Sequence, residues 1–162
     1  MQNQHPLHRQ RGLTLVELIA ALGIAAIIIA GALALYNSAN DSQVATTTLQ
    51  DLTAIQQAAR AKYQGSYPAS AETFKSDLVN IGRWPATSQG RISVSASTAD
   101  AYTLEVRNLN KAVCSSLASS SKGWLAIKKE GSSISVIASN PTSTEVTAAC
   151  NADNVTLQFV GN

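Results

Sequence analysis

The first quarter of the chain contains one long apolar block. No polar side chain occurs at the 18 consecutive positions from Leu18 to Leu35, which meets the length criterion for a helix that crosses a membrane. Extending the block back to Leu13 adds only Thr14 and Glu17 as polar side chains. As a helix, residues 13–36 would measure about 36 Å, whereas the hydrocarbon core of a bilayer is about 30 Å thick. The block therefore predicts a membrane-spanning helix.

A second helical pattern follows directly. Apolar residues recur at spacings of 4, 3, 3, 4 and 4, which is typical of one face of an amphipathic helix. No proline interrupts the chain between Leu13 and Tyr67, and Gly65 is a suitable helix end. We therefore predict one helix of about 50 residues whose second half packs on a globular head. The apolar positions of this second half are Ala45, Leu49, Leu52, Ile55, Ala59 and Tyr63.

The remainder of the chain, rich in Ser and Thr, alternates short apolar runs with turn residues. Helical spacing predicts a short helix over residues 70–81, closed by Gly82. Alternation predicts strands, and Glu130 with Gly131 suggests a hairpin between the third and fourth of them. The fold class is thus α+β, with an antiparallel sheet of four or five strands packed by one face on the long helix. The strands are expected at residues 92–96, 102–106, 124–129, 134–138 and 155–160.

Charge and residue types exclude several functions. The formal net charge is +2, and without Arg9 and Arg11 the basic and acidic side chains balance, which argues against direct binding of nucleic acid. Both histidines, His5 and His8, lie in the first dozen residues. If that segment is removed, no imidazole remains for catalysis or metal binding. The chain also lacks a GxSxG motif and a phosphate-binding loop, so we expect no enzyme activity, no cofactor and no metal. A basic spot of Lys128 and Lys129 with Arg107 or Lys122 is interpreted as a solvated hairpin edge.

Three interpretations of the amino terminus compete. A secretory signal would explain the basic start, but the apolar block is too long for one. A single-span anchor, with Arg9 and Arg11 in the cytoplasm, fits the length. Neither explains Glu17, because a carboxylate in an apolar span costs a few kcal/mol and is usually functional. Glu17 requires a partner.

The segment from Arg11 to Ile19 reads RGLTLVELI and resembles the processing site of type IV prepilins. The resemblance comprises a basic leader, the glycine, a hydrophobic residue after it, the glutamate and an uninterrupted apolar helix. It implies that a membrane peptidase cuts between Gly12 and Leu13 and methylates the new amine. It also makes Glu17 the family's glutamate in the first turn of the mature helix.

The new amine would supply the partner that Glu17 requires. In a bundle of identical helices, the carboxylate of one copy can meet the Leu13 amine of a neighbour, and this attraction strengthens in apolar surroundings. A subunit docked out of register would leave both charges unpaired, so the pair would select the axial stagger. Two alternatives stay open: Glu17 pairs with the amine of its own chain, or it only marks the peptidase site.

The two cysteines, Cys114 and Cys150, form the other constellation with chemistry in it. They lack CxxC spacing and a nearby histidine, which argues against a metal site. Beyond the membrane, in an oxidising compartment, we expect them to form a disulfide rather than remain free thiols. Cys114 is predicted on a helix after Asn110, and Cys150 at the end of one begun by a capping box of Thr142 and Glu145. The layout of this region resembles the type IVb branch of the pilins.

The sequence thus predicts the major subunit of a type IV, and more narrowly a type IVb, pilus. The expected divisions are a leader (1–12), a membrane and assembly half-helix (13–36), an amphipathic half-helix (37–64) and a head (65–162) with the disulfide-bounded region 114–150. The implied partners are further copies of the chain in a helical filament, the prepilin peptidase, and an inner-membrane platform with a cytoplasmic ATPase. The precursor would lie in the inner membrane of a Gram-negative bacterium with its head in the periplasm. The alternatives are a minor pilin, a type II secretion pseudopilin and a monomeric membrane-anchored binding protein.

Overall fold

The computed structural model describes residues 14–85, 90–131 and 141–162. The chain divides into two compact units, with the boundary between Ala39 and Asn40. Helix α1 (Leu15–Tyr63) is continuous across this boundary and has 49 residues, close to the expected length. Its first half is exposed and is long and apolar enough to cross a membrane. Every buried residue of α1 lies from Ala45 onward.

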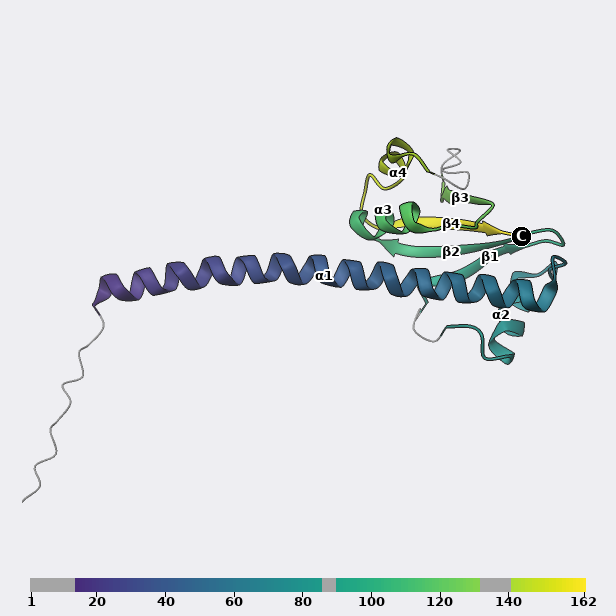
Figure 1. Cartoon of the computed structure of the whole chain (residues 1–162), viewed down its shortest axis with the longest axis horizontal. Helices are drawn as coiled ribbons and strands as arrows, with labels where there is room; N and C mark the ends of the chain where they lie inside the picture. The colour runs from purple at the N-terminus through teal and green to yellow at the C-terminus, as the bar shows by residue number, and fades with distance from the viewer. Residues whose placement is uncertain (1–13, 86–89, 132–140) are drawn as a thin grey trace, which may run out of the picture. The chain divides into compact units, whose positions relative to one another are not determined.

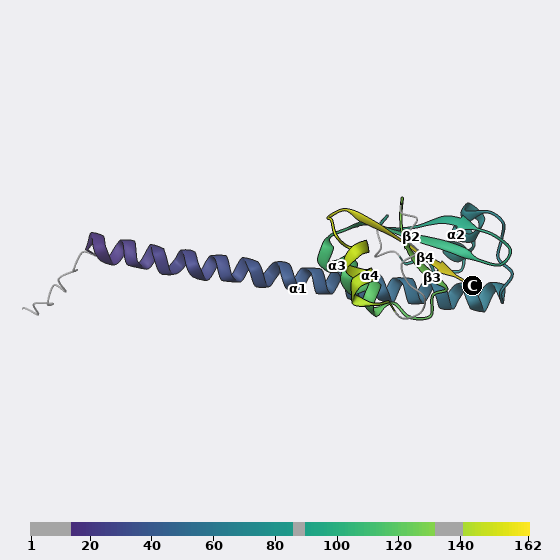
Figure 2. The same ribbon diagram turned by 90° about the horizontal axis from the view of Figure 1, so that it is seen from above.

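The second half of α1 lies alongside a four-stranded antiparallel sheet (Figures 1 and 2). The predicted apolar face is confirmed, because Ala45, Leu52, Ile55 and Ala59 are buried and Leu49 and Tyr63 pack against the same core. After α1, Gly65 adopts a φ of +92°, a conformation that glycine permits without strain. The predicted short helix is observed as α2 (Ala71–Asn80), which buries Phe74 and Leu78.

The sheet has the strand order β1-β2-β4-β3. Strand β4 alternates strictly between buried and half-buried residues, with Val155, Leu157 and Phe159 facing the core. The predicted partner of β3, residues 134–138, lies outside the described residues. Within the described part, β3 pairs with β4. The strands are β1 (Ile92–Ser97), β2 (Tyr102–Leu109), β3 (Ala126–Lys129) and β4 (Val155–Gly161).

Two short helices complete the head. Helix α3 (Lys111–Ser120) begins at Asn110, whose Oδ1 accepts a hydrogen bond from the Val113 amide at 2.8 Å. Helix α4 (Ser143–Ala149) begins at the predicted capping box of Thr142 and Glu145. Both helix starts therefore confirm what the cap residues indicate in the sequence.

A cluster of aromatic rings fills the core between α1, α2 and the sheet. Successive rings lie 4.8–6.2 Å apart between centroids, within the range of favourable stacked and edge contacts. Tyr102 is at the centre and is fully buried, and this burial raises the pKa of its hydroxyl. The cluster consists of Tyr63, Tyr67, Phe74, Tyr102, Trp124 and Phe159.

Replacing Gly161 by alanine should destabilise the head. Gly161 pairs with Tyr102 across β2 and β4, and a Cβ at this position would lie less than 3 Å from three atoms of the Tyr102 side chain. Because the buried ring cannot move without disturbing its neighbours, we expect a loss of about 1–3 kcal/mol in the free energy of unfolding. Urea unfolding measures this loss, with Asn162→Ala as the exposed neighbouring control. An unchanged midpoint for Gly161→Ala would contradict the packing described.

Candidate functional site

The first described turn of α1 holds the glutamate singled out in the sequence. Thr14 precedes the helix, and Glu17 is the acidic residue of its first turn. The Glu17 Oε2 accepts hydrogen bonds from the Thr14 amide at 2.9 Å and from the Thr14 hydroxyl at 3.0 Å. The Glu17 amide in turn donates to the Thr14 Oγ1 at 3.3 Å. Gly12 and Leu13, the expected cleavage residues, lie outside the described residues.

This reciprocal arrangement is a capping box, in which a Thr and a Glu three residues later satisfy free amides at a helix start. Thr14 is a residue that the sequence analysis missed. The signal was present, since the pattern Thr-x-x-Glu at Thr14 is the same one that predicted the start of α4 at Thr142. The cost of a carboxylate in an apolar helix indicates a distant charge as its partner, whereas the partner in the structure is Thr14. The structure therefore adds Thr14 to the site.

The disulfide is the second predicted site, and the structure confirms it. Cys114 of α3 and Cys150, which ends α4, are joined, with a Cα–Cα distance of 5.6 Å. Both cysteines are fully buried. The bond therefore connects the two short helices of the head.

The start of α3 ties this region to its surroundings. The Asn110 Nδ2 donates to the Asp41 Oδ1 on α1 at 2.7 Å, and the Lys111 amide donates to the Asp153 Oδ1 beyond α4 at 3.2 Å. Together with the disulfide, these contacts fix α3 to α1 on one side and to the chain after α4 on the other. The disulfide-bounded region is thus anchored at several points.

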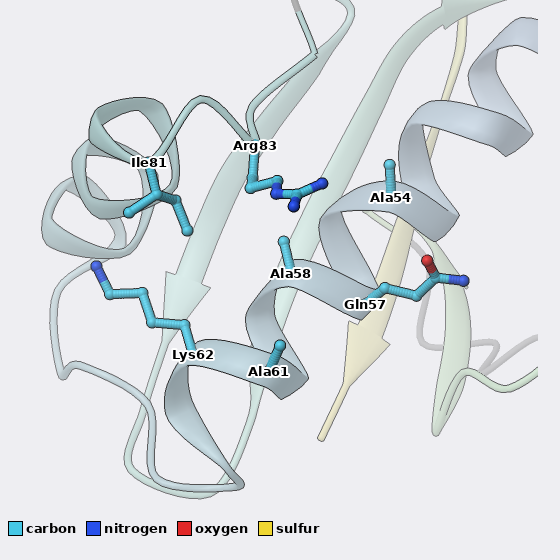
Figure 3. A pocket seen from close by; sticks show the side chains of 7 residues that line it. All are labelled: Ala54, Gln57, Ala58, Ala61, Lys62, Ile81 and Arg83. Atoms are coloured by element: carbon cyan, nitrogen blue, oxygen red, sulfur yellow. The ribbon is translucent and has the colours of Figure 1, made fainter.

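One groove of the head is lined by small apolar, amide and basic side chains. Its volume is about 470 Å³, and it lies between α1 and the segment after α2 (Figure 3). The Lys62 ammonium lies 3.2 Å from the Asp77 carboxylate, which also accepts a hydrogen bond from the Tyr63 hydroxyl at 2.8 Å. These two donors, Tyr63 first, lower the pKa of Asp77. The groove itself is lined by Ala54, Gln57, Ala58, Ala61, Lys62, Ile81 and Arg83, a set without a carboxylate, thiol, hydroxyl or imidazole.

The predicted basic spot is partly neutralised. The Arg107 guanidinium forms an ion pair with the buried Glu105, with 2.6 Å between Nη2 and Oε2. The Lys129 ammonium donates to the Asn151 side chain at 3.0 Å, and Lys128 stands opposite Gln158 in the β3–β4 register. Lys128 and Lys129 lie on β3, at the end of the described strand order, whereas Arg107 lies on the inner strand β2. The predicted hairpin edge includes residues 134–138, which lie outside the described residues.

Known proteins resemble this chain in its amino-terminal motif and in its fold. The model of the prokaryotic N-terminal methylation motif matches residues 7–33. The crystal structure of TcpA, a type IV pilin from Vibrio cholerae El Tor biotype, superposes with a TM-score of 0.56 over 74% of this chain and 99% of that chain, at 19% sequence identity. The chain has the fold of a type IV pilin. The resemblance found in the sequence is therefore confirmed for the motif and for the fold.

Curated proteins with sequences similar to this chain include the toxin coregulated pilin of Vibrio cholerae. One sequence is 32% identical, with 75% of this chain and 64% of the relative aligned. Another, from Vibrio cholerae serotype O1, is 33% identical, with 68% and 58% aligned. The chain thus spans less than two thirds of the length of the curated relatives that it matches.

Proposed function

We propose that the chain is the structural subunit of a type IV pilus, assembled through its apolar amino-terminal helix. The observation that carries the proposal is the position of Glu17, a carboxylate in the first turn of an exposed apolar helix inside a methylation motif. The apolar surface of such a helix is removed from water either in a lipid bilayer or in a bundle of similar helices. A polymer offers the carboxylate a further cationic partner, the amine of a neighbouring subunit, beside the amine of its own chain.

Maturation is the first step of the proposal. The prepilin peptidase hydrolyses the bond between Gly12 and Leu13, which leaves a carboxylate on Gly12 and an amine on Leu13. It then transfers a methyl group from a methyl-donor cosubstrate to that amine. Residues 1–12 are then the leader, 13–36 the membrane and assembly half of the helix, 37–64 its amphipathic half and 65–162 the head. Removal of the leader places a positive amine one helical turn from the negative Glu17.

Assembly follows from the inner membrane. The precursor spans it once, with the head in the periplasm of a Gram-negative cell. A platform driven by a cytoplasmic ATPase then extracts the subunits into a homopolymeric filament outside the cell. The disulfide layout and Leu13 as the new terminus favour the type IVb branch, and the presence of Glu17 favours a major subunit. Such filaments serve conjugation, adhesion or aggregation.

Replacing Gly12 by valine should block maturation. A branched side chain beside the scissile bond prevents its approach to the catalytic groups of the peptidase, so the precursor should accumulate in the inner membrane and filaments should be absent. Intact mass measurement of membrane and sheared fractions tests this, with Gly12→Ala as the conservative control. Wild-type yields of filaments from Gly12→Val would contradict the cleavage assignment.

A further inference from the structure

The capping box at the start of α1 suggests a role for Thr14 that rests on the proposed function. A single carboxylate oxygen of Glu17 accepts two hydrogen bonds from Thr14, at 2.9 Å from the amide and 3.0 Å from the hydroxyl. Hydrogen bonds to an ionised acceptor are stronger than those between neutral groups. The Glu17 side chain is therefore directed towards the start of its own helix.

Both donors remain after the proposed cleavage. Thr14 lies on the carboxyl side of the Gly12–Leu13 bond, so its amide and hydroxyl belong to the precursor and to the mature subunit alike. The new amine forms on Leu13, the residue directly before Thr14. The carboxylate is thus held next to the place where the amine appears.

This placement affects the subunit before and during assembly. In the bilayer, where water cannot hydrogen-bond to the carboxylate, the donors of Thr14 replace part of its hydration. During docking, a side chain that is already ordered loses less conformational entropy when the amine of a neighbour reaches it. A disordered Glu17 would lack both advantages.

The same geometry occurs a second time, in the head. The Glu145 Oε2 accepts from the Thr142 amide and hydroxyl, both at 2.8 Å, and the Glu145 amide donates to the Thr142 Oγ1 at 3.4 Å. The head therefore contains a capping box of the same residue types with no place in the assembly site. This second box provides a matched control for the loss of a helix cap.

We propose that Thr14 is a positioning residue for assembly, which holds the Glu17 carboxylate at the helix start and presents it to the amine of an adjoining subunit. Thr14→Val keeps the backbone amide and the shape of the side chain but removes the hydroxyl. Thr14→Ser restores the hydroxyl. The role acts through Glu17, so it should disappear when Glu17 is replaced.

The first test measures which fraction of the processed subunits reaches sheared filaments. We expect at least about a fivefold fall for Thr14→Val, the effect of losing one such hydrogen bond, and full recovery for Thr14→Ser. Adding Thr14→Val to Glu17→Ala should cause no further loss, and Thr142→Val should leave the fraction unchanged. Wild-type incorporation of Thr14→Val, or an equal fall for Thr142→Val, would overturn the role of Thr14.

The second test does not depend on filaments or on cleavage. Amide hydrogen exchange is measured at Thr14 in the full-length precursor, in membranes from cells without the peptidase. We expect slow exchange in the wild type and fast exchange in Glu17→Ala, because the carboxylate no longer accepts from that amide. Equal rates would overturn the proposal. A wild-type chain that forms no filaments would instead refute the proposed function and leave this measurement decisive for Thr14.

Discussion

Glu17→Ala should give a subunit that is processed normally but is nearly absent from filaments. The substitution removes the only acidic side chain of the apolar helix segment 13–36. Without it, each Leu13 amine enters the helix bundle with no opposite charge. An unpaired charge in an apolar helix costs about 3 kcal/mol on insertion scales, which corresponds to roughly a hundredfold change in an equilibrium constant.

The measurement separates processing from incorporation. Intact masses of the membrane pool report whether the leader has been removed, and the sheared fraction reports how many subunits assemble. Glu145→Ala is the matched control, because it removes the glutamate of an equivalent capping box in the head. Wild-type piliation by Glu17→Ala would show that the charge pair is dispensable. Failure of processing would favour the alternative in which Glu17 only marks the peptidase site.

Loss of the disulfide should destabilise the head more than any single surface change. The bond closes a loop between residues 36 positions apart, for which the chain-entropy model gives about 4 kcal/mol. Cys114→Ser also leaves the Cys150 thiol buried beside a hydroxyl. We therefore expect α3 and α4 to separate more readily and the head to become sensitive to proteases.

Limited proteolysis and urea unfolding of the full chain, with and without reductant, measure this effect. The double variant Cys114→Ser/Cys150→Ser serves as the control for the reduced wild type, because both samples lack the disulfide. Reduced wild type and both variants should be cleaved faster than the oxidised chain. Equal resistance in all four samples would mean that the bond adds no stability to the head.

Local patterns predicted the helices well. The 3.6-residue spacing of Leu52, Ile55 and Ala59 indicated which face of α1 is buried, and that face is buried. The cap residues Asn110 and Thr142 marked the starts of α3 and α4 because their side chains bond amides only three residues away. Signals of this range are contained in a few neighbouring residues.

Long-range partners were not predictable in the same way. The run of residues 124–129 indicated a strand, but nothing local indicated that this strand, β3, pairs with β4. The fit of Tyr102 over Gly161 and the bond from Asn110 to Asp41 join residues more than 50 positions apart. Such contacts depend on the shape of the assembled core, which spacing along one segment does not describe.

The site at the start of α1 shows a different limit. Glu17 was identified because a carboxylate in an apolar block is costly, and this argument favours a distant charge as its partner. The local donor, Thr14, was overlooked although its spacing to Glu17 is that of Thr142 to Glu145. In the proposed function the two partners are compatible, because Thr14 directs the carboxylate towards the start of its own helix.

The most direct test of the account is the intact mass of subunits recovered from sheared surface filaments. We expect a chain that begins at Leu13, carries one methyl group on its amine and keeps the bond between Cys114 and Cys150. Sheared fractions without this chain, or a cellular protein that still begins at Met1, would contradict the account.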